Sequence, residues 1–490
     1  MKKIQRIGML IMSIFIITSC SDQLEVDPTS VITSNSFWKT EGDAQGALVG
    51  MYVNLRTIAS RNLYYVGEAR ADILQLGTVG SGGWDKYYNH LLTPDNAGPS
   101  WQSFYTLINS ANLIIKYVPE IEFTDDANKN LILAQAYAMR AYTYFVMSKT
   151  WGDLIIRTEP VEGVSAEITI KEREPVENVF SLIKSDIDTS LDLFPDNTFA
   201  SGRTMWSKPS VNALKGEVYL WTAKQLGGGA TDLNTALTAL EEIETADVAL
   251  VTDYSDIFNY DNKANEEILM SVKFAQYETG DNYFADMYLI QSALPSDITS
   301  ETQDFLLPIG GNNITVPTDS FKDSFSTDDS RKDATFFEIY LNDGSYYTTV
   351  NVKGRGTVVS GSRLFLDDYI LFRYADVLLM KAEAKNGLGQ DPSAEMNMIR
   401  QRAYGDAFAA HVFVNGSAEE NDAAILEERK LEFGFEGKRW WDLVRFDKAV
   451  EMLPGLAALD DPEGKILFPI STSVLSLEPL VEQNPAYQAN

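Results

Sequence analysis

The sequence predicts a mainly α-helical protein that carries an irregular, loop-rich insertion with a few short strands. Apolar residues recur at helical spacings through two long stretches, residues 36–250 and 368–490. This period fades over residues 251–367, where turns, aromatic residues and short alternating runs follow one another. We therefore expect a single folded domain, residues 36–490, in which a helical scaffold frames the insertion.

Three helical stretches within this scaffold share a loose pattern of one basic and one small residue: Ala136–Tyr144, Ala213–Tyr219 and Ala375–Ala384. The first two also keep a later tyrosine, which the third has lost. They resemble degenerate tetratricopeptide units, whose helix pairs bury their apolar faces only by stacking on one another. Stacked helix pairs are therefore predicted.

The first residues have the pattern of a bacterial lipoprotein signal peptide. After a basic start, the apolar run of residues 7–17 is shorter than the roughly 20 residues that span a bilayer. It leads into Thr18-Ser19-Cys20, which resembles a lipobox, and Cys20 is the only cysteine in the chain. We expect a signal peptide over residues 1–19, a lipid on Cys20 and a flexible tether over residues 20–35. An ordinary secretory peptide cleaved nearby is the alternative.

The folded body begins with a helix over residues 40–56, in which Ala44, Leu48, Met51 and Leu55 fall on one face. Further helices are predicted over residues 101–118, 125–151 and 175–194. Before the helix at residues 101–118, residues 77–99 form a glycine-rich loop.

That loop holds three large rings, Trp84, Tyr87 and Tyr88. Aromatic faces in a loop stack on the C–H faces of sugars or on extended peptides, and their polar groups add hydrogen bonds. The alternative is that the loop folds back and the rings fill a gap in the helical body. The sequence leaves both interpretations open.

The insertion contains a predicted strand over residues 267–274 and a second concentration of aromatic residues, with Tyr283, Phe284 and Tyr288. Irregular segments on a rigid frame commonly carry binding residues, so these three rings are further candidates for ligand contact. A small satellite core is the favoured alternative for any single ring. Acidic pairs at Asp328-Asp329 and Asp367-Asp368 lack the spacing of a calcium loop, so we expect no metal site.

A helix is predicted from the capping-box pair Ser417 and Glu420 to about Phe433, followed by a break at Gly434 and Gly437 and a second helix. Residues 368–389 also have a helical pattern, and residues 465–470 that of a short strand.

Glu428, Glu432 and Glu436 recur every four residues along this C-terminal stretch. A paired ridge of charges between helices is favoured over metal binding or acid/base chemistry, because neither histidine nor cysteine joins the row. In the second helix, Asp442 lies one turn from both Arg439 and Arg445. We expect it to accept hydrogen bonds from both guanidinium groups.

This region resembles the C-terminal signature of the RagB/SusD family, through Glu428, Arg429, Glu432, Glu436, Gly437, Arg439, Asp442 and Arg445. Similar stretches at Glu68–Asp72, Phe372–Leu378 and Glu482–Tyr487 extend the resemblance over nearly the whole chain. It implies a SusD-like fold and a nutrient-binding lipoprotein, anchored in the outer membrane of a Gram-negative cell and facing outward. It further implies a SusC-like TonB-dependent transporter as partner, no cofactor, and a ligand that is a glycan in most members and a peptide in RagB-like ones.

Composition narrows the remaining function classes. The formal charge of −30 repels phosphate backbones, which argues against nucleic-acid binding. His90 and His411 are the only histidines, and no nucleophile or metalloprotease motif occurs. We therefore expect no enzyme, although a glycoside hydrolase that uses two carboxylates and a scaffold that binds only proteins stay open as alternatives.

Overall fold

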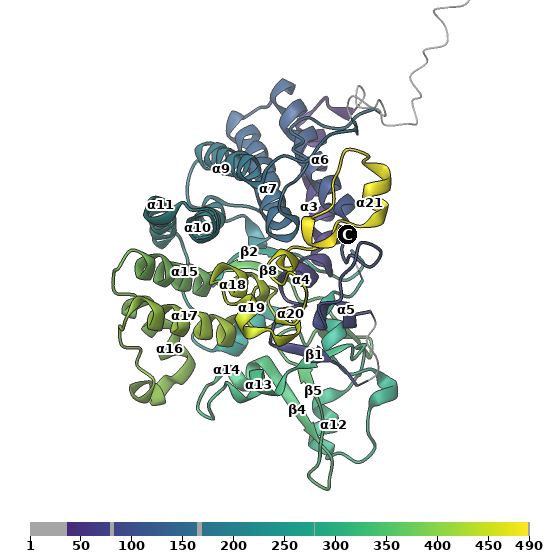
Figure 1. Cartoon of the computed structure of the whole chain (residues 1–490), viewed down its shortest axis with the longest axis vertical. Helices are drawn as coiled ribbons and strands as arrows, with labels where there is room; N and C mark the ends of the chain where they lie inside the picture. Colours follow the sequence, from purple (N-terminus) through teal and green to yellow (C-terminus); the bar gives the residue numbers. More distant parts are fainter. Residues whose placement is uncertain (1–36, 79–82, 164–168, 279, 489–490) are drawn as a thin grey trace, which may run out of the picture.

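The computed structural model describes residues 37–78, 83–163, 169–278 and 280–488. The predicted signal peptide, Cys20 and the tether lie outside these residues. Helices fill the upper and left parts of Figure 1, whereas short strands and small helices gather at the lower end. The prediction of a mainly helical fold with a few strands is confirmed. Within the described ranges, no helix is both long and apolar enough to cross a membrane.

The long helices of the N-terminal half begin at polar caps, as their sequences predict. Thr40 and Asp43 form a capping box at the start of the first helix, and Ser100 and Asp125 cap two others. The helices are α3 (Glu41–Ala59), α4 (Asn62–Gly67), α5 (Asp85–Tyr88), α6 (Trp101–Tyr117), α7 (Asp126–Trp151), α9 (Val176–Leu193), α10 (Lys208–Gln225) and α11 (Gly229–Glu242).

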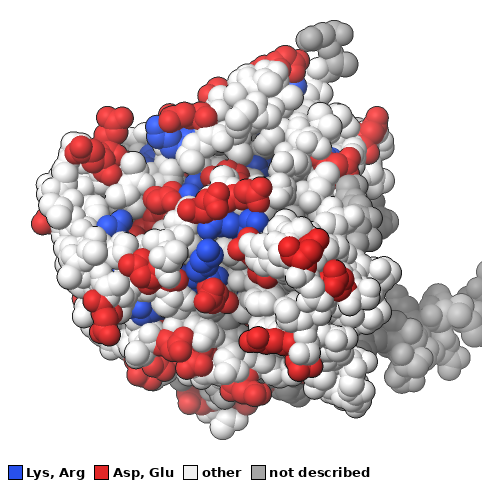
Figure 2. Space-filling model, turned by 90° about the horizontal axis from the view of Figure 1, so that it is seen from below, with Lys and Arg blue, Asp and Glu red and all other residues white. Residues whose placement is uncertain are grey.

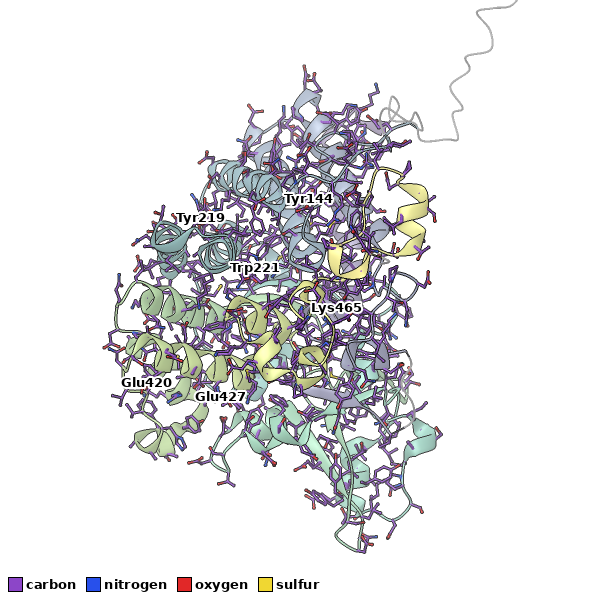
Figure 3. The ribbon with its side chains drawn as sticks, in the orientation of Figure 1. Tyr144, Tyr219, Trp221, Glu420, Glu427 and Lys465 are labelled. Carbon is purple, nitrogen blue, oxygen red and sulfur yellow. The ribbon has the colours of Figure 1, made fainter. Side chains whose placement is uncertain are left out.

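Neighbouring helices stack in a row, as tetratricopeptide-type pairs do. Helix α7 packs between α6 and α9, α10 pairs with α11, and α11 continues the row toward the C-terminal helices. Figure 3 labels Tyr144 on α7 and Tyr219 on α10, the tyrosines of the two similar stretches. The hydroxyl of Tyr144 donates to the carbonyl oxygens of Ile155 and Arg157, whereas the half-buried Tyr219 lies under the ammonium group of Lys184. The two tyrosines thus have different contacts.

The insertion is built from two-stranded antiparallel pairs and short helices. Strand β1 (Leu74–Leu76) pairs with β3 (Thr315–Pro317), β4 (Phe336–Tyr340) with β5 (Tyr346–Asn351), and β6 (Thr357–Val359) with β7 (Ser362–Leu364). Strand β2 (Ile268–Val272) confirms the predicted strand, and it pairs with β8 (Tyr369–Arg373). The helices here are α12 (Ser300–Leu306), α13 (Asp319–Asp323) and α14 (Arg331–Thr335).

Short 3-10 helices join these elements. They are η1 (Val118–Glu120), η2 (Ser201–Arg203), η3 (Ile243–Thr245), η4 (Tyr254–Phe258), η5 (Tyr260–Asn262), η6 (Tyr283–Met287), η7 (Gln291–Ala293), η8 (Gly405–Ala410), η9 (Gly464–Ile466) and η10 (Pro485–Tyr487).

The C-terminal helices close the row, and α17 matches its prediction. Ser417 and Glu420 form the capping box, and the helix ends at Phe433. The helices are α15 (Tyr374–Gly387), α16 (Ser393–Tyr404), α17 (Ala418–Phe433), α18 (Arg439–Arg445), α19 (Ala449–Met452), α20 (Pro454–Ala457) and α21 (Thr472–Leu477).

Two predictions of secondary structure in this half are wrong. The helix expected from residue 368 begins only at Tyr374, because residues 369–373 form β8 and take their hydrogen bonds from β2. The strand expected over residues 465–470 is absent from the described chain: a 3-10 turn occupies its start. The backbone N–H of Phe468 donates instead to the carbonyl of Thr150, and that of Ile470 to the side chain of Gln483.

The segment Glu68–Asp72 fixes the break between α17 and α18. The buried carboxylate of Glu68 accepts hydrogen bonds from the backbone N–H groups of Phe435, Lys438 and Arg439 at 2.7, 2.8 and 3.1 Å. Asp72 binds the guanidinium of Arg439 through two bonds of 2.8 Å. Two stretches that are distant in sequence are thereby joined at the centre of the molecule.

This arrangement corrects the prediction for Asp442. Its carboxylate does accept from Arg445, at 3.0 Å. The second partner is Arg429 of α17, at 2.9 Å, because Arg439 is already held by Asp72. The expected ion network is therefore present, with one member exchanged.

A second network surrounds the row of glutamates. Arg373 is fully buried and binds Glu267, Glu432 and Glu436 at 2.6, 2.6 and 2.8 Å. The row is thus a ridge of ion pairs between elements, which is the structural alternative favoured from the sequence. The network joins five carboxylates to five cations: Glu267, Asp329, Glu428, Glu432 and Glu436 to Arg331, Lys353, Arg373, Arg400 and Arg402.

Candidate functional site

The structure brings the two predicted groups of aromatic residues together through Tyr64, a residue of α4. The ring of Tyr64 stacks on Tyr283 with 4.1 Å between centroids and meets the edge of Trp84 at 5.7 Å. Its neighbour Tyr65 stacks on Tyr87 at 5.2 Å. We call these five rings, together with Phe284 next to Tyr283, the aromatic cluster.

Most rings of the aromatic cluster are interior. Trp84, Tyr87, Tyr283 and Phe284 are each at most 4% exposed. Tyr288, the remaining candidate of the insertion, is fully buried and packs on Phe365 rather than on the cluster. Such burial favours the core interpretation for these rings, because their faces already have partners. Ligand contact by them stays a prediction, and Tyr88 is the candidate ring that reaches the surface, at 38% exposure.

Glycine and backbone contacts hold the cluster in place. The ring of Phe284 lies where a side chain on Gly354 would begin, about 2.0 Å from the position of its Cβ atom. The hydroxyl of Tyr283 donates to the carbonyl of Phe435 at 2.9 Å. The cluster is therefore tied to the loop between α17 and α18, next to the site that Glu68 caps.

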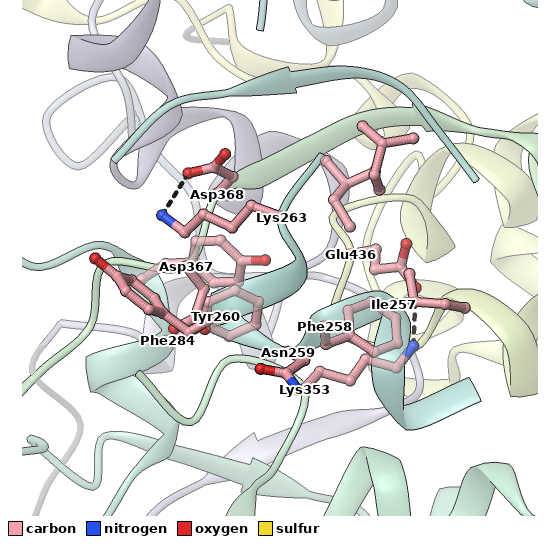
Figure 4. A pocket seen from close by; sticks show the side chains of 13 residues that line it. Ile257, Phe258, Asn259, Tyr260, Lys263, Phe284, Lys353, Asp367, Asp368 and Glu436 are labelled. Carbon is pink, nitrogen blue, oxygen red and sulfur yellow. Dashed lines mark hydrogen bonds and ion pairs between the residues drawn. The ribbon is translucent and has the colours of Figure 1, made fainter. Parts of the chain in front are cut away.

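A small cavity lies behind Phe284 and Tyr283 (Figure 4). Its volume of about 30 Å³ accommodates one or two water-sized molecules, and a sugar ring is larger. Ion pairs of 2.8 Å between Lys263 and Asp368 and between Lys353 and Glu436 border it. The cavity is therefore too small for a sugar, and any ligand contact by the cluster would lie elsewhere on it.

A polar rim adjoins the aromatic cluster. Arg61, the N-cap residue that precedes α4, forms an ion pair with Asp286 of η6 at 3.2 Å, and the Arg61 side chain keeps 34% of its surface exposed. Asn312 donates to the other oxygen of Asp286 at 2.8 Å. Beside them, Tyr65 is half-buried. We call Arg61, Tyr65, Tyr88, Asp286 and Asn312 the rim.

Electrostatics keep Tyr65 neutral and Arg61 charged at neutral pH. Burial, reinforced by the nearby Asp286, raises the pKa of Tyr65 to about 12, so its hydroxyl stays neutral. Burial opposes the charge of Arg61, but Asp286 raises the pKa of Arg61 above its usual value. The rim thus offers a neutral hydroxyl, a guanidinium and an amide, while the buried carboxylate of Asp286 holds the guanidinium and the amide in place. These are the groups that bind the hydroxyls of a polar ligand.

Two carboxylates of the glutamate row, Glu432 and Glu436, have pKa values below the ordinary one, because neighbouring cations outweigh the effect of burial. Burial alone raises the pKa of Glu432, but the guanidinium groups of Arg402, Arg373 and Arg331 hold it well below its usual range. A general acid needs the opposite shift. Within the described part of the chain, no group of three or more metal-binding side chains comes together.

The residues that connect the two groups of candidate rings were not predicted from the sequence. Tyr64 and Tyr65 belong to the short helix α4, which Arg61 precedes as its N-cap residue and Glu68 directly follows. The tyrosine pair was visible in the sequence, and its position one turn before a segment of the family signature was the available signal.

The surface charge is unevenly placed. Figure 2 shows one face on which acidic side chains are widely scattered, while basic side chains gather near its centre. The formal charge of the chain is −30. A surface of this kind disfavours polyanionic ligands through general repulsion.

The sequence is similar to those of known proteins. The SusD family model matches residues 315–455, and a family model described as starch-binding associating with outer membrane matches residues 23–220. SusD-like protein P38 of Formosa agariphila is 30% identical over 529 aligned positions, which cover 99% of this chain and 100% of the relative.

Solved structures with similar folds support the same conclusion. NanU of B. fragilis is 34% identical with a TM-score of 0.83, over 95% of this chain and 100% of NanU. A laminarin binding SusD-like protein shares the fold with a TM-score of 0.75 at 22% identity, over 92% of this chain and 100% of that protein. The similarity thus spans both the helical row and the insertion, and the chain belongs to the SusD/RagB family.

Proposed function

We propose that this protein is a lipid-anchored outer-membrane protein of the cell surface, which binds a glycan at the rim and delivers it to a SusC-like TonB-dependent transporter. The observation that carries the binding proposal is the rim itself. The exposed ring of Tyr88 directly follows Tyr87 in the chain, and Tyr87 stacks on Tyr65; the partly exposed guanidinium of Arg61 belongs to the same rim.

The chemistry of the rim suits a sugar. A pyranose has apolar C–H faces, which stack on an aromatic ring, and hydroxyl groups, which both donate and accept hydrogen bonds. The phenol of Tyr65 adds a donor and an acceptor, and the partly exposed guanidinium of Arg61, which the buried Asp286 holds in place, supplies a strong donor. Because these two charges are paired, the rim itself does not select a charged ligand.

The comparisons support a glycan and an outer-membrane location. One matching family is described as starch-binding and associated with the outer membrane. One solved neighbour binds laminarin, and others are surface glycan-binding proteins. The acidic charge of this chain favours a neutral glycan over an anionic one. The lipobox-like residues before Cys20 support the proposal of a lipid anchor, and the family resemblance supports the proposal of delivery to a transporter.

Calorimetric titration of the complete chain in detergent tests the binding. The panel holds laminarihexaose and maltoheptaose as neutral glycans, oligogalacturonate as an anionic glycan, and a mixed-sequence hexapeptide. We expect a neutral glycan to bind, and Arg61→Met to weaken that binding about tenfold or more through the loss of a charged hydrogen bond. Arg56→Met is the matched control, since Arg56 also sits in a partly exposed ion pair, with Glu278, outside the rim.

Binding of the hexapeptide alone would replace the glycan by a peptide ligand, and release of reducing ends during the titration would establish a glycoside hydrolase. Delivery is tested by growth. A strain that lacks this protein should grow poorly on the glycan that binds, and unchanged growth would contradict the transport role.

A further inference from the structure

A groove with a volume of about 570 Å³ lies between the start of α6, the extended residues 155–161 and the C-terminal helix α21. This volume is typical of sites for small ligands. None of the rim residues is among those that line it, so the groove is a separate place on the surface. Figure 1 shows α6 and α21 side by side at the upper right of the molecule.

Two polar atoms of the lining lack a partner among the described residues. The indole Nε1–H of Trp101 has no acceptor, although the side chain is only 3% exposed. The Oε2 atom of Glu478 has no donor, while its Oε1 atom accepts from Arg157 at 3.4 Å. A buried donor or acceptor without a partner costs free energy. A ligand that supplies one acceptor and one donor here would recover that loss.

The extended segment beside the groove does not offer its backbone to a peptide strand. Side chains of α6 and α7 already form hydrogen bonds with the backbone of five of its residues. The backbone groups involved are the carbonyls of Ile155, Arg157, Thr158 and Glu159 and the N–H groups of Arg157 and Val161. Peptide recognition by strand addition needs free backbone groups of this kind. The groove therefore relies on side chains for recognition.

Those side chains are aromatic, amide and hydroxyl groups. Tyr105 and Trp101 provide rings, and Gln102, Asn109 and Thr106 provide neutral polar groups. The charged residues of the described lining are Arg157 and Glu478, which pair with each other. A site with paired charges, neutral hydrogen-bonding groups and aromatic walls fits an uncharged ligand that is rich in hydroxyls.

We propose that this groove is a second binding site, which takes a neutral oligosaccharide independently of the rim. Trp101 Nε1–H donates to a ring or hydroxyl oxygen of the sugar, and Glu478 Oε2 accepts from one of its hydroxyls. The apolar side chains of Val474 and Leu477 on α21 lie along the C–H faces. A long glycan that reached both sites would gain affinity from each at once.

The test uses the complete chain with the substitution Tyr88→Ala, which weakens binding at the rim. The protein is in detergent solution, and laminarihexaose, maltoheptaose and cellohexaose are the probes. Amide exchange followed by mass spectrometry reports the groove through residues 100–109 and 472–478. We expect at least one probe to protect both segments. Trp101→Phe keeps the ring and removes the donor, and it should weaken this binding about threefold to tenfold.

Glu478→Gln is the second variant, and it should weaken binding about tenfold or more because a charged acceptor is lost. Trp206→Phe is the matched control: Trp206 is equally buried and its Nε1–H also lacks an acceptor among the described residues, but it does not line the groove. This variant should bind as the parent does.

Two results would overturn the proposal: no neutral probe protects the two segments, or protection is unchanged in both Trp101→Phe and Glu478→Gln. If glycan binding depends on Arg61 and Tyr88 while the groove shows no protection, the rim proposal stands and the second site is refuted. If a glycan protects the two segments of the groove while Arg61→Met and Tyr88→Ala leave glycan binding unchanged, the second site stands and the rim proposal is refuted.

Discussion

The buried network around Arg373 makes a strong prediction about stability. Arg373→Met replaces the guanidinium by an apolar side chain of similar length. In the protein, Arg373 is fully buried and bonds to the carboxylates of Glu267, Glu432 and Glu436 and to the backbone oxygen of Glu432 at 2.8 Å. The substitution leaves the five carboxylates of the network facing four cations.

The size of the effect follows from this imbalance. Removal of one partner from a buried ion pair costs about 3–5 kcal/mol, because the other charge stays buried without compensation. Here the remaining cations Arg331, Arg402 and Lys353 compensate part of the charge, so we expect the lower half of that range. A second substitution, Glu436→Gln, restores the balance of four against four and should recover part of the loss.

Urea unfolding at pH 7.5, followed by tryptophan fluorescence, measures these free energies. Arg56→Met is the control, because its partner Glu278 is 41% exposed, and an exposed pair contributes at most about 1 kcal/mol. The reasoning is refuted if Arg373→Met costs no more than Arg56→Met, or if Glu436→Gln makes the Arg373→Met protein still less stable.

Three further predictions concern stability. Gly437→Ala should lower the free energy of unfolding by about 2–4 kcal/mol in the urea assay. Gly437 has φ +76°, and the added Cβ atom would lie 2.0 Å from the Tyr369 hydroxyl. An unchanged urea midpoint would contradict this prediction. Ser417→Ala should cost about 1 kcal/mol by removal of the α17 cap, and a Ser417→Asp protein of native stability is its control. Burial raises the pKa of Asp367 to about 7 in the folded protein, whereas this carboxyl group has its ordinary pKa of 3.8 in the unfolded chain. The free energy of unfolding therefore decreases as the pH rises from about 4 to about 7. Asp367→Asn removes that loss and should stabilise the protein by about 2–4 kcal/mol at pH 8 but not at pH 4; equal effects at both pH values would refute the assignment.

The elements that the sequence predicted well are those with local signals. Helix α17 carries its capping box, its apolar stripe and its glycine stop within a single run of residues, so both of its ends were predicted correctly. Strand β8 carries no such signal. Its five residues lead directly into α15, and a short apolar run fits a strand and a buried helix equally well.

The partners of the charged residues depended on tertiary contacts. The spacing of Asp442, Arg439 and Arg445 along one helix was clear, but Asp72 is 367 residues distant from Arg439 in sequence and takes it away from Asp442. Likewise, nothing in the local sequence shows that Tyr64 bridges Trp84 and Tyr283. The candidate rings were therefore found as two groups, and only the folded structure shows that four of them, Trp84, Tyr87, Tyr283 and Phe284, share one interior cluster.

The measurement that tests the central claim most directly compares two exposed tyrosines. Tyr88→Ala removes the ring of the rim, and Tyr340→Ala removes a ring of similar exposure, 45% against 38%, on the β4–β5 hairpin. The neutral glycan that binds most tightly in the calorimetric panel is titrated into both proteins. Glycan binding at the rim predicts that Tyr88→Ala raises Kd about tenfold, since one stacked ring is lost, and that Tyr340→Ala leaves it unchanged. Equal Kd values for the two variants would contradict the claim.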